Sequence, residues 1–246
     1  MTNPYIWHSY FIIDCKLVLV MDHYDGSLQN FIRSSQRPQD QSHQIQKILY
    51  STLLALDYIH NKGYIHLDLK PQNILVREKH NVIEVVLADF GLARVIKSYG
   101  SRDVDKDGRP GTGPYNGYPD THYSKQVDIW ALGLVAYYTV ASIQSGQEIT
   151  YSELVKLRDA SKDFNGSFKS QLENQIDSHQ HCFIRLIQDC LNPEPAQREP
   201  FSSSFPPPQD DVESKLNYVT KRVEDHGKKL DELDQKIEEK SYCDLL

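Results

Sequence analysis

The chain has 246 residues, enough for one large domain or for one domain with an appendage. Its hydrophobic fraction of 39% and its 15 tyrosines suit a globular core and argue against general disorder. The net charge of −7 argues against a general binder of nucleic acids or anionic membranes, because both reward an excess of lysine and arginine. Four scattered cysteines favour a reduced, cytoplasmic protein, with a nuclear location also open.

The first half of the chain predicts two strands, a long helix and two further strands. The runs "YIWHSYFII" and "KLVLVM" are rich in the β-branched and aromatic residues that strands prefer, and "HYDGSLQNFI" then leads towards a helix. Apolar residues recur on one face between 42 and 61, which predicts a helix that Gly63 ends. The runs "NILV" and "VIEVVLADFG" predict short buried strands.

The second half begins with a predicted loop over 94–120, which is polar and rich in glycine and proline. The run "VDIWALGLVAYYTV" has almost no polar side chains after its first aspartate and predicts a central helix buried on all sides. Further helices are predicted over 151–160 and 175–191. The stretch 201–211 is rich in proline and serine and predicts a linker.

The tail over 212–240 has apolar residues at alternating spacings of four and three, which predicts a coiled coil and self-association. A single helix folded back on the domain is the alternative. No apolar run approaches the roughly 20 residues of a membrane-spanning helix, so we expect no transmembrane segment. The final "CDLL" fits a prenylation pattern but lacks a polybasic second signal, so we expect Cys243 to carry no lipid.

A polar cluster interrupts the apolar stretch "YIHLDLKPQNIL" and predicts phosphoryl transfer. Asp68, Lys70 and Asn73 lie within six positions, and Asp89 follows at the end of a predicted buried strand. An acid can orient a hydroxyl, a lysine can offset phosphate charge, and an amide with a second acid can hold Mg²⁺. These groups suit phosphoryl transfer, which is catalysed mainly by positioning and electrostatics.

These residues stand in motifs that resemble the eukaryotic protein kinase family of the serine/threonine type. "HLDLKPQN" is similar to the catalytic-loop pattern H-R-D-L-x-x-x-N, and "DFG" follows at a suitable spacing. "GTGPYNGYPD" resembles the end of an activation segment, while "DIWALG" and "CLNPEPAQREP" resemble helices of the C-lobe. The resemblance implies an α+β, protein-kinase-like fold: a two-strand N-lobe remnant and hinge over 1–24, a mostly helical C-lobe over 25–200, and a C-terminal helix.

The resemblance also implies the roles of the clustered residues. Asp68 would accept or orient the substrate hydroxyl proton, and Lys70 would stabilise the transferred phosphoryl group. Asn73 and Asp89 would bind Mg²⁺, with ATP as the phosphoryl donor and a protein as the substrate. The nucleotide would also contact hinge residues, namely Met21, Asp22 and Tyr24. Structural support would come from a further set: His66, Phe90, Gly91, Thr112, Asp120, Asp128 and Arg198.

Three departures from the family pattern affect regulation and activity. Leu67 stands in place of the usual arginine and cannot pair with a phosphate, which argues against the usual control by activation-loop phosphorylation. Asp120 is one methylene shorter than the usual glutamate, so its pairing with Arg198 is expected to be strained or water-bridged. The Gly-rich loop, the strand lysine and its partner glutamate belong upstream of the first strand, and we expect the chain to lack them.

Two functions therefore remain open. The first is a protein serine/threonine kinase that transfers the ATP γ-phosphoryl group to a protein hydroxyl, with little activity expected from these 246 residues alone. The second is a non-catalytic, kinase-like scaffold that oligomerises through its coiled tail.

Overall fold

A computed structural model describes most of the chain between residues 22 and 198 and, by backbone alone, two earlier strands. The described ranges are 9–13, 16–20, 22–34, 42–79, 82–95, 111–116, 124–164, 166–176, 181–198, 205 and 208. Residues 23–208 form one compact unit, and the N-terminal strands belong to a second unit, so each is described by itself. The predictions for Met21, Asp120, Cys243, the coiled coil and most of the linker fall outside the described residues.

The N-terminal unit contains an antiparallel hairpin. Strand β1 (Ser9–Ile13) pairs with β2 (Lys16–Val20), with Ser9 opposite Val20 and Ile13 opposite Lys16. Both strands lie within the runs that the sequence predicted, so these two elements are confirmed.

A three-stranded antiparallel sheet lies in the larger unit. Its order is β3 (Gly26–Ser27), β5 (Ile74–Lys79) and β6 (Val82–Leu87). In the β5–β6 hairpin Ile74 lies opposite Leu87, so the residues just before β5 and just after β6 are neighbours. This register places the two predicted magnesium ligands, Asn73 and Asp89, near each other.

A second strand pair corrects the predicted loop over 94–120 at its start. Strand β4 (Tyr64–Ile65) pairs with β7 (Arg94–Val95), so residues 94 and 95 are extended and bonded to the segment that leads into the polar cluster. Pairing with β4 is a tertiary contact, which the polar composition of the segment could not indicate. Residues 96–110 and 117–123 lie outside the described ranges.

The first two helices of the larger unit are α1 and α2. Helix α1 (Leu28–Ser34) follows β3 directly, and α2 (Ser42–Asn61) has the bounds that periodicity predicted. After α2 the chain turns at Gly63, whose φ of +81° lies in the left-handed region that glycine adopts without a steric penalty.

Helix α3 (Lys125–Ser145) is the centre of the unit. Every residue from 127 to 142 is buried, as its continuous apolar run predicted, although the helix is longer than that run. Among the described residues it is the only helix long and apolar enough to cross a membrane. An 18-residue window within it has a mean hydropathy of 1.2. Because 89% of that window is buried inside the fold, its composition is that of a core helix.

Three shorter helices follow. Helix α4 (Tyr151–Ala160) has its predicted bounds and begins with a capping box in which the side chains of Thr150 and Glu153 bond reciprocally to each other's backbone. The predicted helix over 175–191 is wrong at its start: α5 (Ser167–Gln175) ends there, and α6 (His181–Cys190) is a separate helix. Ile176 has extended backbone angles, which end α5. Single 3₁₀ turns are Pro71–Asn73, Phe90–Leu92, Gly113–Tyr115, Ser161–Asp163 and Pro195–Gln197.

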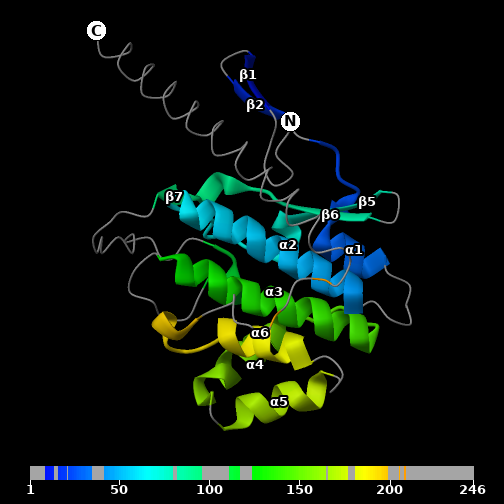
Figure 1. Cartoon of the computed structure of the whole chain (residues 1–246), viewed down its shortest axis with the longest axis vertical. Helices are drawn as coiled ribbons and strands as arrows, with labels where there is room; N and C mark the ends of the chain where they lie inside the picture. The colour runs from blue at the N-terminus through cyan, green and yellow to red at the C-terminus, as the bar shows by residue number, and fades with distance from the viewer. Residues whose placement is uncertain are drawn as a thin grey trace. The chain divides into compact units, whose positions relative to one another are not determined.

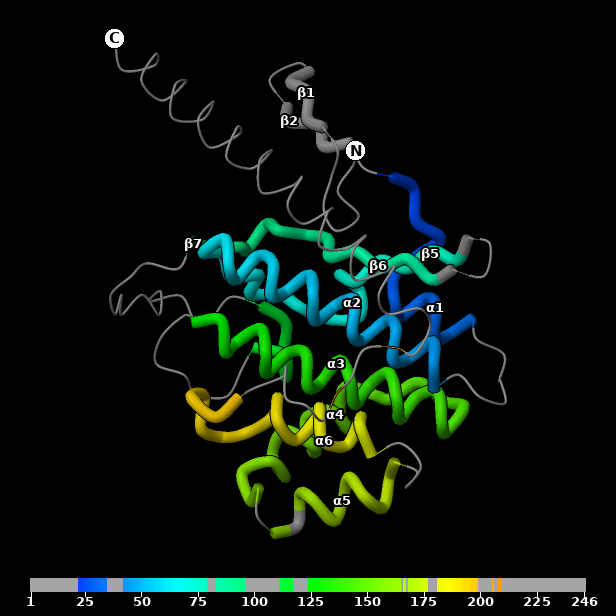
Figure 2. Tube along the Cα trace, viewed as in Figure 1, coloured from blue at the N-terminus to red at the C-terminus, as the bar shows by residue number. Residues whose placement is uncertain are grey.

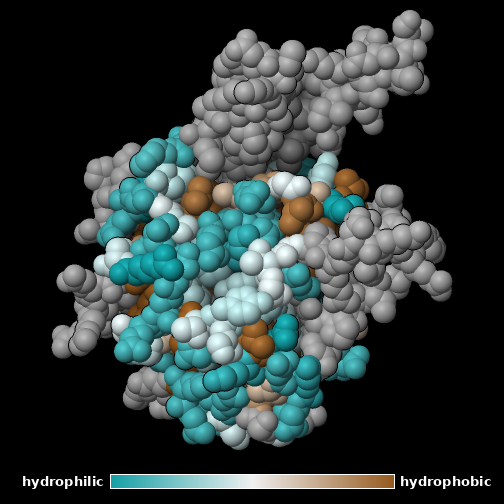
Figure 3. All heavy atoms as spheres, turned by 180° about the vertical axis from the view of Figure 1, so that it is seen from behind, coloured by the Kyte–Doolittle hydropathy of each residue, from teal (hydrophilic) through white to brown (hydrophobic). Residues whose placement is uncertain are grey.

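The elements of the larger unit stack in layers. The β5–β6 hairpin contacts α2, α2 contacts α3, and α3 contacts α6, with α4 and α5 beyond (Figure 1). The tube trace shows the same succession, with α3 enclosed between α2 and α6 (Figure 2). On the face shown in Figure 3 the described surface is mainly hydrophilic, with hydrophobic residues in small patches. The α+β architecture is therefore confirmed, with its core around α3.

Gly133 lets α3 approach the end of α6, and we predict that a methyl group there destabilises the fold. A Cβ at Gly133 would lie 2.7 Å from Cys190 Cβ and 2.8 Å from Leu191 Cγ. Gly133→Ala is expected to lower the free energy of unfolding by about 1–3 kcal/mol in urea denaturation, because overpacking outweighs the better helix propensity of alanine. In Gly133→Ala/Leu191→Ala the combined loss should be smaller than the sum of the single losses. Unchanged or increased stability of Gly133→Ala would contradict this packing.

Candidate active site

The carboxylate of Asp68 is the centre of the polar cluster. Its Oδ1 accepts a hydrogen bond from Thr112 Oγ1 at 2.7 Å, and its Oδ2 accepts from Lys70 Nζ at 2.7 Å and from Asn73 Nδ2 at 3.1 Å. A carboxylate has about four acceptor positions, so roughly one remains for an incoming hydroxyl. Asp68 is buried, and its orientation is fixed by partners on both oxygens.

Thr112 joins a distant segment to this carboxylate. Its hydroxyl also accepts a bond from Lys70 Nζ at 2.8 Å, which closes a ring of three side chains. The preceding residue, Gly111, packs so closely that a Cβ there would lie 2.6 Å from the carbonyl oxygen of Leu67. Its φ of +106° also favours glycine. Gly111 therefore allows the segment 111–116 to contact the catalytic loop.

The two predicted magnesium ligands are neighbours across the β5–β6 hairpin. Asn73 immediately precedes β5, and its carbonyl accepts a hydrogen bond from Ala88 N–H at 2.9 Å, one residue before Asp89. The Asn73 amide nitrogen bonds to the backbone oxygen and the carboxylate of Asp68, which leaves its Oδ1 as an acceptor. Asp89 is exposed, with a left-handed φ of +61°.

This pair of oxygen donors fits Mg²⁺, which is usually held by one or two carboxylates together with phosphate oxygens and water. Among the described residues no three histidine, cysteine, aspartate or glutamate side chains form a fuller metal cage. The donors therefore suit a metal that arrives with a phosphate-bearing ligand. Gly91 lies beside this site, since a Cβ there would be 3.3 Å from Asp89 Oδ1.

Asp128 on α3 anchors the start of the catalytic loop. Its carboxylate accepts backbone N–H bonds from His66 at 2.8 Å and from Leu67 at 2.9 Å, and it contacts His60 Nε2 at 2.8 Å. Leu67 has a φ of +65°, a strained conformation for a residue with a side chain. The charge-assisted bonds to Asp128 hold this turn.

His66 links the catalytic loop to the "DFG" turn. Its Nε2 bonds to the carbonyl of Ala88 at 3.0 Å, and its Nδ1 accepts from the N–H of Asp68 at 3.3 Å. Because a carbonyl only accepts and an N–H only donates, the ring is neutral with its proton on Nε2. Burial lowers the pKa of the imidazole below 6.5, against the carboxylates of Asp128, Asp68 and Asp89, which favour the charged form. The ring of Phe90 packs on it, with centroids 4.7 Å apart.

Trp130 on α3 connects Arg198 with the segment that carries Thr112. The Arg198 guanidinium lies 4.9 Å from the Trp130 ring and donates to the carbonyls of Asn192 and Gln126. Trp130 Nε1 in turn donates to the carbonyl of Pro114 at 3.3 Å. Arg198 is buried, but its predicted partner Asp120 lies outside the described residues, so that pairing stays a prediction.

Two of the three predicted hinge residues, Asp22 and Tyr24, lie within the described part of the chain. Asp22 is exposed, Tyr24 is half-buried, and the Arg77 guanidinium lies 4.7 Å above the Tyr24 ring. Their predicted contact with a nucleotide stays a prediction, as does that of Met21.

Three supporting residues were missed by the sequence reasoning: His60, Gly111 and Trp130. His60 offered the clearest signal, because it follows Leu56 by four residues and so shares the buried face of α2. The roles of Gly111 and Trp130 depend on tertiary contacts that no local pattern announces.

Comparison with known proteins identifies related sequences. A family model described as the protein kinase domain matches residues 5–205. The chain is 33% identical over 157 residues to an interferon-induced, double-stranded RNA-activated protein kinase of Rattus norvegicus. The matched stretch covers 62% of this chain and 30% of that protein.

Two nematode proteins give similar matches. Serine/threonine-protein kinase dkf-1 of Caenorhabditis briggsae is 30% identical over 145 residues, which are 57% of this chain and 19% of that protein. Cyclin-dependent kinase 17 of Caenorhabditis elegans is 34% identical over 143 residues, which are 56% of this chain and 20% of that protein. The matched region is thus less than a third of each relative.

Replacing the buried Asp128 carboxylate tests its role as an anchor. We predict that Asp128→Asn lowers the free energy of unfolding by about 2–4 kcal/mol, because the amide brings a donor to a place where every partner also donates. Urea denaturation gives the comparison. Asp57→Asn is the control, since Asp57 is only half-buried on α2, and it should change stability by less than about 0.5 kcal/mol. Equal losses in the two variants would contradict the anchoring role.

The neutral state of His66 predicts a pH dependence. Its pKa is lowered in the folded chain, so the unfolded chain binds the proton more readily and stability falls as pH drops below 6.5. The contribution reaches at most about 1.4 kcal/mol per pH unit. Urea midpoints between pH 7.5 and pH 5.5 should therefore change less in His66→Gln, whose amide can also donate and accept. An identical pH dependence in both proteins would contradict the assignment.

Proposed function

The chain belongs to the protein kinase family, and from this membership we propose that it transfers the γ-phosphoryl group of ATP to serine or threonine hydroxyls of proteins. The family in general uses ATP and Mg²⁺ and acts on protein substrates. The observation that carries the proposal is the arrangement around Asp68, whose carboxylate is held by Lys70 and Thr112.

In the proposed reaction Asp68 orients the acceptor hydroxyl and takes its proton. Thr112 and Lys70 hold the two carboxylate oxygens, so the remaining acceptor position is fixed before a substrate arrives. Preorganisation of this kind avoids reorganisation at the moment of reaction. The Lys70 ammonium also lies beside the reacting groups, where it would offset negative charge on the transferred phosphoryl group.

Asn73 and Asp89 would hold Mg²⁺ through their side-chain oxygens, and the bound ion would neutralise charge on the ATP phosphates. The backbone bond between Asn73 and Ala88 supports this proposal, because it keeps the two donors adjacent. Phosphate contacts in the family also come from a Gly-rich loop and a strand lysine, so the protein should be tested in the form that cells express.

Leu67 supports the proposal that the active arrangement does not require a phosphorylated loop residue. Its side chain is buried with Ile65 and Val127, where it adds to the core rather than to a phosphate site. The hydrogen bonds that join Asp68, Lys70 and Thr112 in a ring are made by these three side chains themselves.

The proposal predicts that Asp68→Asn removes phosphoryl transfer while leaving the fold intact. Transfer from γ-labelled ATP to a mixture of protein substrates should fall by about 10²-fold or more, because the proton acceptor is lost. The control is Asp159→Asn, an exposed carboxylate of α4 that pairs with Lys162, which should retain wild-type rates.

Two results would contradict the proposal. The first is equal transfer by wild-type protein and Asp68→Asn, which would mean that the activity arises elsewhere. The second is the absence of Mg²⁺-dependent transfer from the wild-type protein as cells express it, which would favour the non-catalytic scaffold. Thermal denaturation of each variant checks that a lost rate is not a lost fold.

A further inference from the structure

Arg77 on β5 contacts the end of the predicted hinge through two groups. Its Nη1 donates to the carbonyl of His23 at 3.0 Å, and its guanidinium lies over the Tyr24 ring, 4.7 Å from the ring centroid. A cation is attracted to the face of an aromatic ring, so the second contact adds to the first. One arginine side chain therefore holds a backbone carbonyl and the side chain of the next residue.

Glu84 on β6 fixes the orientation of this guanidinium. It lies directly opposite Arg77 in the register of the hairpin, and its carboxylate accepts from Arg77 Nε at 3.0 Å and also from Nη2. The two side chains are 22% and 39% exposed, so solvent screens the ion pair only in part. Because Nε and Nη2 bond to the carboxylate and the guanidinium is planar, the direction of Nη1 towards His23 is set.

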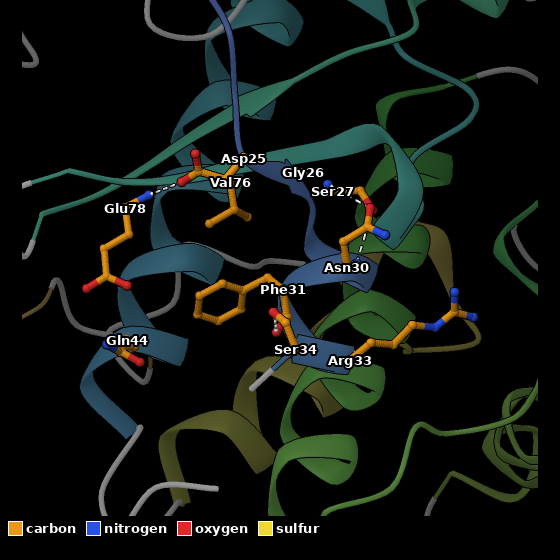
Figure 4. Close-up of a pocket in the computed structure, with 10 residues that line it drawn as sticks. All are labelled: Asp25, Gly26, Ser27, Asn30, Phe31, Arg33, Ser34, Gln44, Val76 and Glu78. Atoms are coloured by element: carbon orange, nitrogen blue, oxygen red, sulfur yellow. Dashed lines mark hydrogen bonds between the residues drawn. The ribbon is translucent and has the colours of Figure 1, made fainter. Parts of the chain in front are cut away.

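The residues that follow Tyr24 are bonded to the same strand. The Asp25 carboxylate accepts a hydrogen bond from the N–H of Glu78 at 3.0 Å (Figure 4). Gly26 then pairs with Val76 in the sheet. A hollow of about 750 Å³ lies between this segment, α1 and the first turn of α2. Because the hollow takes the place of side-chain packing on that side, the bonds to β5 determine where the segment lies.

Strand β5 connects this segment with the proposed Mg²⁺ site. Asn73 immediately precedes the strand and Arg77 is its fourth residue, so at about 3.3 Å per residue the two lie about 13 Å apart along it. That span is comparable with the length of an extended nucleoside triphosphate. A nucleotide whose phosphates lie at Asn73 and Asp89 can thus reach residues 22–24 with its base.

We infer that Arg77 is a positioning residue for the base of the nucleotide. It holds the His23 carbonyl and the Tyr24 ring, and thereby fixes the backbone of residues 22–24 before a nucleotide binds. Groups that are already ordered bind a ligand more tightly, because no ordering is required on binding. The inference rests on the proposed function. In this assignment Arg77 touches neither the phosphates nor the reacting atoms.

The kinetic test compares the wild-type protein, in the form that cells express, with Arg77→Met, which keeps an unbranched chain but loses the charge and the donors. KM for ATP should rise about fivefold, the scale of one hydrogen bond, while kcat at saturating ATP stays within about twofold. Arg158→Met is the control, since Arg158 pairs with Asp159 on α4, and it should change neither constant. A lower kcat with unchanged KM, or no change in either constant, would overturn the inference.

Adenosine binding separates positioning of the base from direct contact with phosphate. Displacement of a fluorescent ADP analogue gives the affinities of ATP with Mg²⁺ and of adenosine. In Arg77→Met both affinities should fall by the same factor, because only contacts to the base are affected. Asp89→Asn should instead weaken ATP alone. If Arg77→Met weakens ATP but not adenosine, the guanidinium binds phosphate and the positioning role is wrong.

A conservative variant and the binding data complete the design. Arg77→Lys keeps a cation for the Tyr24 ring but has no planar fork to bond Glu84 and His23 together, so its KM should lie between those of wild type and Arg77→Met. The binding measurements need no phosphoryl transfer. If transfer is absent but Arg77→Met weakens ATP and adenosine equally, the positioning role stands and the kinase function does not. If transfer occurs and neither KM nor adenosine affinity responds, the function stands and the positioning role does not.

Discussion

The buried carboxylate of Asp128 is the interaction on which the catalytic loop depends. It lies in the first turn of the central helix and satisfies two consecutive backbone N–H groups, those of His66 and Leu67. A left-handed residue with a side chain costs about 1–3 kcal/mol, and charge-assisted bonds of this kind offset that cost. Because the carboxylate sits in a low-dielectric core, its hydrogen bonds are stronger than they would be in water, and its loss would leave buried donors unpaired.

The same helix also fixes the second half of the site. Trp130, two residues after Asp128, bonds to the carbonyl of Pro114 and so holds the segment that presents Thr112. One buried helix therefore positions two segments that are distant in sequence, and the side-chain ring of Asp68, Lys70 and Thr112 forms where they meet. This explains why α3 is apolar on all sides: its neighbours on every side include parts of the site or the helices that support them.

The local sequence pattern predicted the elements with a strong hydrophobic periodicity. It failed where a tertiary contact determines the structure or the role of a residue. Helix α2 was predicted to its end residues because its buried face repeats over five turns, whereas α5 was missed because its short, polar sequence has no comparable stripe. Asp68, Lys70, Asn73 and Asp89 were predicted from the polar cluster and the order of the motifs. His60, Gly111 and Trp130 were not, since each acts through a partner far away in the sequence. Strand β7 was assigned to a loop for the same reason.

The bond between Thr112 and Asp68 spans 44 residues of chain, and it has a thermodynamic consequence. Any ligand of the segment 111–116 that prefers the bonded arrangement stabilises it by the difference between its two affinities. An interaction that orders the Asp68 carboxylate in turn raises the affinity of the segment for the ligand. By reciprocity, the ligand strengthens that interaction by the same factor. Ligand binding to the segment 111–116 and alignment of the Asp68 carboxylate are thus linked equilibria. A change that perturbs the binding alters the free energy of the alignment, and the reverse also holds.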